Sequence, residues 1–131
     1  MFTQEDFFEL VKTGTPQDVQ AAIKSGASVN IRNKDGWTAL MGAAEYNPNP
    51  EMITALLAAG ADVNAQNKDG WTALMAAAVF NQNPEVITAL LAAGADAKAN
   101  DVVGKTAFDY AQTRAKLKGT DAYRKLKEAA Q

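Results

Sequence analysis

The chain has 131 residues, of which 47% are hydrophobic, and this size and composition favour one folded domain with a continuous core. The net charge of −2 removes the usual electrostatic argument for nucleic-acid binding. Because the chain contains no cysteine and no histidine, the sequence excludes disulfides, Cys/His zinc sites, thiol nucleophiles and Ser-His or Cys-His catalytic pairs.

The first segment, residues 1–32, predicts a pair of helices within residues 5–25. Apolar side chains cluster between positions 7 and 11, and Thr15 followed by Pro16 is typical of the start of a second helix, which ends before Gly26. No turn of the kind that follows later in the chain precedes this pair. We therefore expect residues 1–32 to form an N-terminal cap.

The middle of the chain is an internal repeat. Residues 34–41 return unchanged as 68–75, and residues 53–62 return as 87–96. Aligning 33–66 with 67–100 gives 26 identities in 34 positions, and the glycines at 36, 70 and 104 keep the same phase. Such a period indicates stacked supersecondary units, each too small to fold alone.

Each of these units, 33–66 and 67–100, predicts a turn, a helix, a loop and a second helix. Gly36 provides the tight turn, and Thr38 caps the first helix. Asn49 caps the second helix, with Pro50 at its first position, and Gly60 ends it. Apolar residues at 52, 53, 56 and 57 follow the helical period. We expect helical pairs within 38–59 and 72–93.

The last segment, residues 101–131, predicts a final helical pair within 106–130. Residues 104–111 have the pattern of a last repeat, and a longer loop through Gly119 leads to a helix that begins after Thr120. This segment carries seven basic and four acidic side chains, so its end is basic. We expect it to form a C-terminal cap.

These motifs resemble those of the ankyrin repeat, on residues 35–44 (DGWTALMGAA) and 56–65 (LLAAGADVNA) and their copies. The resemblance implies an all-α ankyrin-repeat solenoid: a single domain over 1–131 with four stacked helix-turn-helix units, two full repeats and two caps, and short hairpin-like fingers. The sequence departs from the family in having TALM where TPLH is usual, and 34 residues in each repeat where 33 are usual. We expect Met41 and Met75, at the position of the family's histidine, to be buried.

No residues point to catalysis, a metal site or a cofactor. The acidic residues of the repeats occupy turn and helix-start positions, where backbone geometry already explains them. The tripeptide 104–106 (GKT) lacks the first glycine and the preceding strand of a phosphate-binding loop. We therefore expect no enzyme and no cofactor.

Two tryptophans and the differences between the repeats suggest a surface for a protein partner. Trp37 and Trp71 follow the turn glycines, a position that in the ankyrin family faces the groove between the fingers and the first helices. They either stiffen the array or serve as aromatic anchors, one per repeat and roughly 10 Å apart. The repeats differ at the end of the first helix, which is either drift or contact with a partner. The candidate partner-binding residues are Lys34, Asp35, Trp37, Glu45, Tyr46, Lys68, Asp69, Trp71, Val79, Phe80 and Lys105.

The resemblance implies a monomeric protein–protein interaction module that uses its concave finger and first-helix face. A structural or engineered repeat scaffold without a dedicated ligand is the alternative. One basic and four acidic residues in 33–66 favour a partner with some basic character. No apolar run approaches the roughly 20 residues that span a bilayer, and the acidic start does not resemble a signal peptide. A complete natural protein of this kind is expected in the cytoplasm; a secreted or periplasmic protein that has lost its leader is the other possibility.

Overall fold

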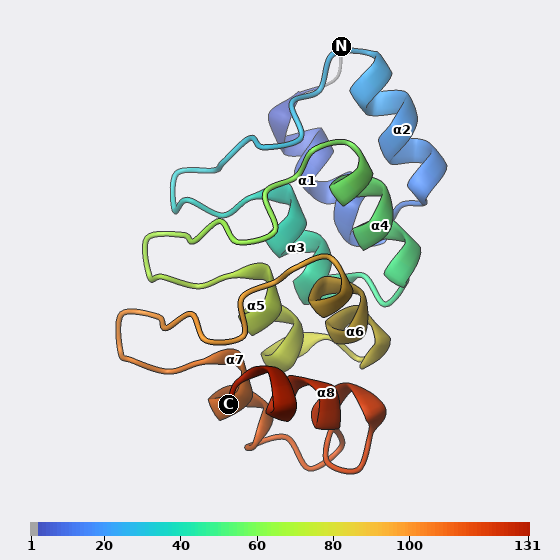
Figure 1. The fold of residues 1–131 in the computed structure, drawn as a ribbon. Coiled ribbons are helices and arrows are strands. Elements are labelled where there is room, and N and C mark those ends of the chain that lie inside the picture. The colour runs from blue at the N-terminus through green and yellow to red at the C-terminus, as the bar shows by residue number, and fades with distance from the viewer. Residues whose placement is uncertain (1–2) are drawn as a thin grey trace.

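The computed structural model describes residues 3–131, in which eight helices form two parallel rows (Figure 1). Within each row, every helix packs on its counterpart one unit further along the chain. The first row contains α1 (Gln4–Thr13), α3 (Ala39–Tyr46), α5 (Ala73–Phe80) and α7 (Ala107–Ala111). The second row contains α2 (Pro16–Lys24), α4 (Pro50–Ala58), α6 (Glu85–Ala92) and α8 (Asp121–Ala129). The expected helical pairs are confirmed.

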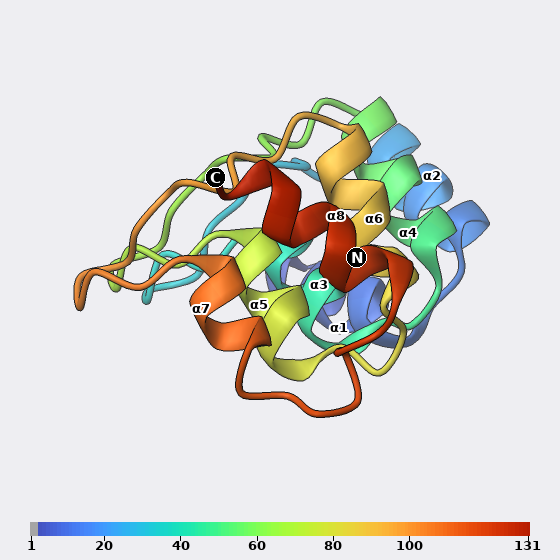
Figure 2. The same cartoon turned by 60° about the horizontal axis from the view of Figure 1, so that its bottom comes forward.

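Three fingers, residues 27–38, 61–72 and 95–106, project from the same side of the stack (Figure 1). Figure 2 shows that they lie next to the first row and away from the second. In residues 3–131 the extended pairing is limited to a single bridge between Arg32 and Thr38. The expected fold, a helical solenoid with short fingers and no extended sheet, is therefore confirmed.

The helix boundaries follow the capping residues that the sequence indicates. The Thr38 side chain accepts a hydrogen bond from the Met41 amide at 3.2 Å, and Asn49 accepts one from the Glu51 amide at 3.0 Å. Gly60 ends the second helix with a φ of +100°, which glycine adopts at the least cost. Local chemistry thus fixes where each helix begins and ends.

Small side chains let the first-row helices pack closely. Most buried residues of α3 and α5 are alanine or glycine, so successive helices of the first row pack on one another with little volume between them. Met41 and Met75 are each only 1% exposed, which confirms the expectation that both methionines are buried.

Buried asparagines tie each unit to the one before it. The side-chain amide of Asn47 donates to the carbonyl oxygens of Val11 at 3.0 Å and Gly14 at 3.3 Å. One repeat later, Asn81 donates to the carbonyl oxygens of Ala44 and Asn47, both at 2.8 Å. These bonds satisfy carbonyl groups that a helix end leaves without partners, and they fix the register between units.

In the last unit, an arginine takes the role of the asparagine and ties the unit to the one before it. Arg114 donates to the carbonyl oxygens of Ala78 at 2.9 Å and Asn81 at 3.0 Å. Burial lowers the pKa of the guanidinium group, but it stays charged because arginine titrates so far above neutral pH.

Adjacent fingers touch through their turn glycines. Gly70 has a φ of +78°, and a β-carbon there would lie 3.0 Å from the α-carbon of Asp101. Beside it, the Val102 amide donates to the carbonyl oxygen of Asp69 at 2.9 Å. Glycine therefore allows both the turn and the close approach of the second and third fingers.

Candidate functional site

A groove lies between the second and third fingers and the ends of the first-row helices. Its volume is about 410 Å³, within the range of roughly 300–1,000 Å³ that is usual for binding clefts. The fingers form one wall, and side chains from α3, α5 and α7 form the other. The lining residues are Trp37, Glu45, Asn67, Asp69, Trp71, Phe80, Asp101, Val102, Val103 and Tyr110.

Aromatic rings form the base of this groove. The ring centroids of Trp37 and Trp71 are 6.3 Å apart, and Trp71 lies 6.1 Å from Phe80 and 5.3 Å from Tyr110. The expected separation of roughly 10 Å between the tryptophans is therefore wrong for their rings. Helix packing sets the spacing of the backbones, whereas the large indoles reach beyond their backbones and come closer to each other. Each tryptophan packs on a neighbouring ring and lines the groove.

The third finger makes the groove more apolar than the repeat pattern alone predicts. Val102 and Val103 occupy the positions of the Lys-Asp pair in the two earlier fingers, and they are 71% and 69% exposed. Lys105 stands where the earlier units have tryptophan. Tyr110 supplies the aromatic ring in its place, from the first-row helix α7.

A buried carboxylate holds Tyr110 in place. The Tyr110 hydroxyl donates a hydrogen bond to Asp101, which also accepts from the amides of Val103 at 3.0 Å and Lys105 at 2.9 Å. Burial favours a higher pKa for Asp101, but these hydrogen bonds outweigh it and lower the pKa below the ordinary value. The hydrogen bond to Asp101, followed by burial, raises the pKa of Tyr110. The pair therefore stays as carboxylate and phenol at neutral pH.

A smaller hollow of about 190 Å³ adjoins the groove near the first unit. It contains Tyr46, which is 56% exposed, and shares Trp37 and Glu45 with the groove. Lys12 lies over the Tyr46 ring, with its Nζ atom 5.0 Å from the centroid. Burial raises the pKa of Glu45, while its hydrogen bond with Tyr46 and the charge of Lys12 act in the opposite direction. The charge of Glu45, followed by burial, raises the pKa of Tyr46.

The structure brings some of the sequence-predicted site residues together and leaves others apart. Trp37, Glu45, Asp69, Trp71 and Phe80 line the groove, and Phe80 is 46% exposed. The smaller hollow takes in Asp35 and Tyr46. Four predicted residues line neither: Lys34, Lys68 and Lys105 are exposed, and Val79 is half-buried.

Five further residues of the groove are absent from the sequence-based set: Asn67, Asp101, Val102, Val103 and Tyr110. For the two valines and Tyr110, the phase of the turn glycines gives a sequence signal. It aligns Tyr110 with the glycine at 42 and the alanine at 76, and it aligns the two valines with charged pairs. A large or apolar residue at a position that is small or charged in the other units marks a change in the surface.

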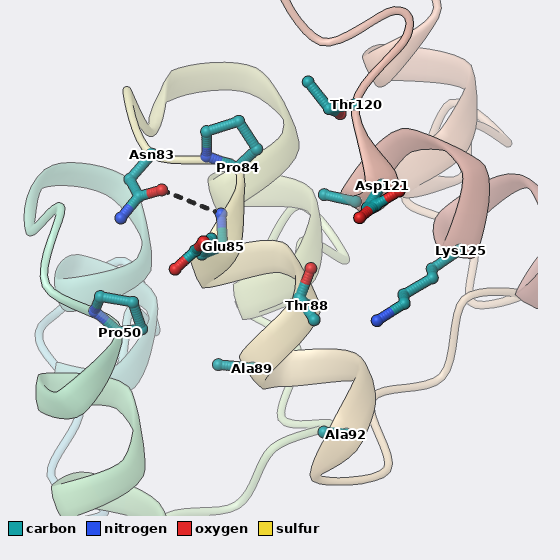
Figure 3. A pocket seen from close by; sticks show the side chains of 11 residues that line it. Pro50, Asn83, Pro84, Glu85, Thr88, Ala89, Ala92, Thr120, Asp121 and Lys125 are labelled. Carbon is teal, nitrogen blue, oxygen red and sulfur yellow. Dashed lines mark hydrogen bonds between the residues drawn. The ribbon is translucent and has the colours of Figure 1, made fainter.

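A second, larger hollow of about 560 Å³, the outer hollow, lies on the second row, between α4, α6 and α8. Figure 3 shows Thr88, Ala89 and Ala92 of α6 on one side, and Asp121 and Lys125 of α8 on the other. The hollow exists because these α6 side chains are small. Among the described residues that line it, none is aromatic, and Asp121 already lies 3.5 Å from Arg124 in an ion pair. The composition of the groove is closer to that of binding hot spots, although its volume is smaller.

Residues 7–101 match the family described as Ankyrin repeats (3 copies). The match covers most of the chain, and the chain belongs to the ankyrin-repeat family. Ankyrin repeats are generally protein–protein interaction modules, and the family is typically non-enzymatic. No curated protein matches the sequence. Among residues 3–131, no helix has the length and apolar character needed to cross a membrane.

Proposed function

We propose that this chain binds a protein partner through the groove between its second and third fingers and its first-row helices. The observation that carries the proposal is the exposed apolar surface at the groove. Phe80, Val102 and Val103 are 46%, 71% and 69% exposed, beside the contiguous rings of Trp37 and Trp71. An apolar centre with a charged rim is the usual composition of a protein interface.

The rigidity of the groove supports the same proposal. The aromatic rings pack on one another, Asp101 holds Tyr110, and the second and third fingers are joined by a backbone hydrogen bond. A preformed surface loses little conformational entropy when a partner binds. Exposed Asp69 lines the groove beside this apolar surface, and the exposed Lys68 next to it in the chain adds a second charge at the finger tip.

The test compares capture of a partner by three immobilised forms of the chain, using extract from the native source. The double variant Val102→Lys/Val103→Asp restores the tip residues of the other two fingers, so it keeps the finger chemistry and removes the apolar surface. Lys125→Glu changes an exposed residue of the outer hollow and serves as the control.

We expect one saturable partner to bind the parent chain and the Lys125→Glu control, and to bind the double variant at least about tenfold more weakly. Equal binding of the partner to the parent and the double variant would remove the groove as the site. A complete absence of saturable binding would favour the alternative, a repeat scaffold without a dedicated ligand.

A further inference from the structure

The titratable side chains that line the groove are acidic or phenolic. They are Glu45, Asp69, Asp101 and Tyr110. Within residues 3–131, none of the three carboxylates belongs to an ion pair. Asp101 is occupied by Tyr110 and two backbone amides. The negative charge that a bound group would meet therefore comes from Asp69 and from Glu45, which also hydrogen-bonds with Tyr46 and lies near the charge of Lys12.

Lysines of the chain itself already lie over two tyrosine rings, Tyr46 in the adjoining hollow and Tyr110 in the groove. The Nζ atom of Lys12 is 5.0 Å from the Tyr46 ring centroid, and that of Lys105 is 5.6 Å from the Tyr110 centroid. Both distances fall within the range of roughly 6 Å for cation–π attraction. In the part of the chain that the structure describes, the central rings of Trp37, Trp71 and Phe80 have no such cation.

The apolar part of the groove continues beyond the rings. Val102 and Val103 lie on the finger side, and the volume of about 410 Å³ exceeds that of a single side chain. The groove therefore has room for one long side chain together with parts of its neighbours in a bound segment.

From this arrangement we infer that the groove accepts an arginine side chain of the partner, flanked by apolar residues, and this inference rests on the proposed function. The guanidinium group stacks on the central rings and faces Glu45 and Asp69, while the neighbouring apolar side chains cover Val102 and Val103. Arginine fits better than lysine, because its planar group stacks on aromatic faces, binds carboxylates through paired donors and is less strongly hydrated.

The experiment begins with a phage-displayed library of random 12-residue peptides, selected on the folded parent chain. The enriched peptides are then synthesised in three forms, with arginine, with citrulline as its neutral analogue, and with lysine at the same position. Their dissociation constants are measured by isothermal titration calorimetry against the parent and the variant chains.

Two double variants with the same change in net charge distinguish an effect of the groove carboxylates on peptide binding from a general effect of the charge of the protein. Glu45→Gln/Asp69→Asn neutralises the two carboxylates of the groove, and Glu51→Gln/Glu85→Gln neutralises two exposed carboxylates of the second row that line neither the groove nor the hollow beside it. We expect enriched peptides to contain an arginine between apolar residues. The parent and the control variant should prefer arginine to citrulline by about tenfold, and the groove variant by less than about threefold. Lysine should bind with intermediate affinity.

Two results overturn the inference in distinguishable ways. The arginine site is refuted if the peptides show no preference for arginine, or if this preference survives in the groove variant. If those peptides still lose binding to Val102→Lys/Val103→Asp, the proposed function stands. Peptides that bind the Val102→Lys/Val103→Asp variant as well as the parent place the binding surface elsewhere and refute both.

Discussion

The buried asparagine that joins two repeats gives the sharpest prediction about stability. The side chain of Asn81 is 2% exposed. Its amide donates to two carbonyl groups at 2.8 Å, and its oxygen accepts from the Asn83 amide at 2.8 Å. Replacing Asn81 with alanine leaves these three backbone groups without their partner in a site that water reaches poorly.

A comparison with Asn64 gives the expected loss of unfolding free energy. Asn64 also joins two units, donating to the Gly94 carbonyl at 3.2 Å and accepting from the Asp96 amide at 2.7 Å, but it is exposed. Water can replace its bonds, so Asn64→Ala should cost about 0.5–1 kcal/mol. Because each group left unsatisfied in a buried site costs roughly 1–3 kcal/mol, and relaxation recovers part of this, Asn81→Ala should cost about 3 kcal/mol.

Urea unfolding followed by far-ultraviolet circular dichroism measures both values, with the slope of the transition as a check that the unfolded states are comparable. The reasoning is refuted if the two variants lose unfolding free energies within about 0.5 kcal/mol of each other, since Asn81 is buried and makes three such bonds whereas Asn64 is exposed and makes two.

Three further predictions use the same unfolding measurements. Gly70→Ala should cost more than Gly104→Ala, because both positions have positive φ but only a β-carbon at Gly70 meets a neighbouring finger. Met75→Ala should cost roughly 2–5 kcal/mol, because the side chain is 1% exposed. Tyr110→Phe should lower stability more at pH 6 than at pH 2. The lowered pKa of Asp101 means that its charge stabilises the fold above the ordinary value of about 3.9, and this contribution disappears as the pH falls through the folded-state value.

Each of these three predictions has a result that would contradict it. Equal losses for the two glycine variants would mean that the fingers separate at little cost. A loss below about 1 kcal/mol for Met75→Ala would show that the core closes around the missing side chain. An effect of Tyr110→Phe that is the same at both pH values would show that the Asp101 charge is not what the phenol stabilises.

The fold could be predicted from the sequence because its determinants are local and repeated. Gly60, Thr38 and Asn49 each fix a helix boundary through bonds to residues a few positions away. The 34-residue phase then requires the units to stack, since short helices cannot bury an apolar face alone. The assignment of the terminal segments 1–32 and 101–131 as caps stays a prediction.

The groove could be predicted only in part, because it depends on side chains that reach between units. The spacing of the backbones does not show that the indoles of Trp37 and Trp71 touch, nor that Tyr110 joins them from α7. The apolar tip at Val102 and Val103 breaks the repeat, so the phase of the turn glycines points to it but identity between the repeats does not. The partner-binding residues themselves stay a prediction until a partner is bound.

Hydrogen exchange of the chain with and without its captured partner tests the central claim most directly, because backbone amides report protection along the whole stack. Binding in the groove predicts slower exchange in the second and third fingers, residues 61–72 and 95–106, and at the end of α5, with little change in the second row. Protection confined to α4, α6 and α8 would contradict the account and place the partner on the outer hollow.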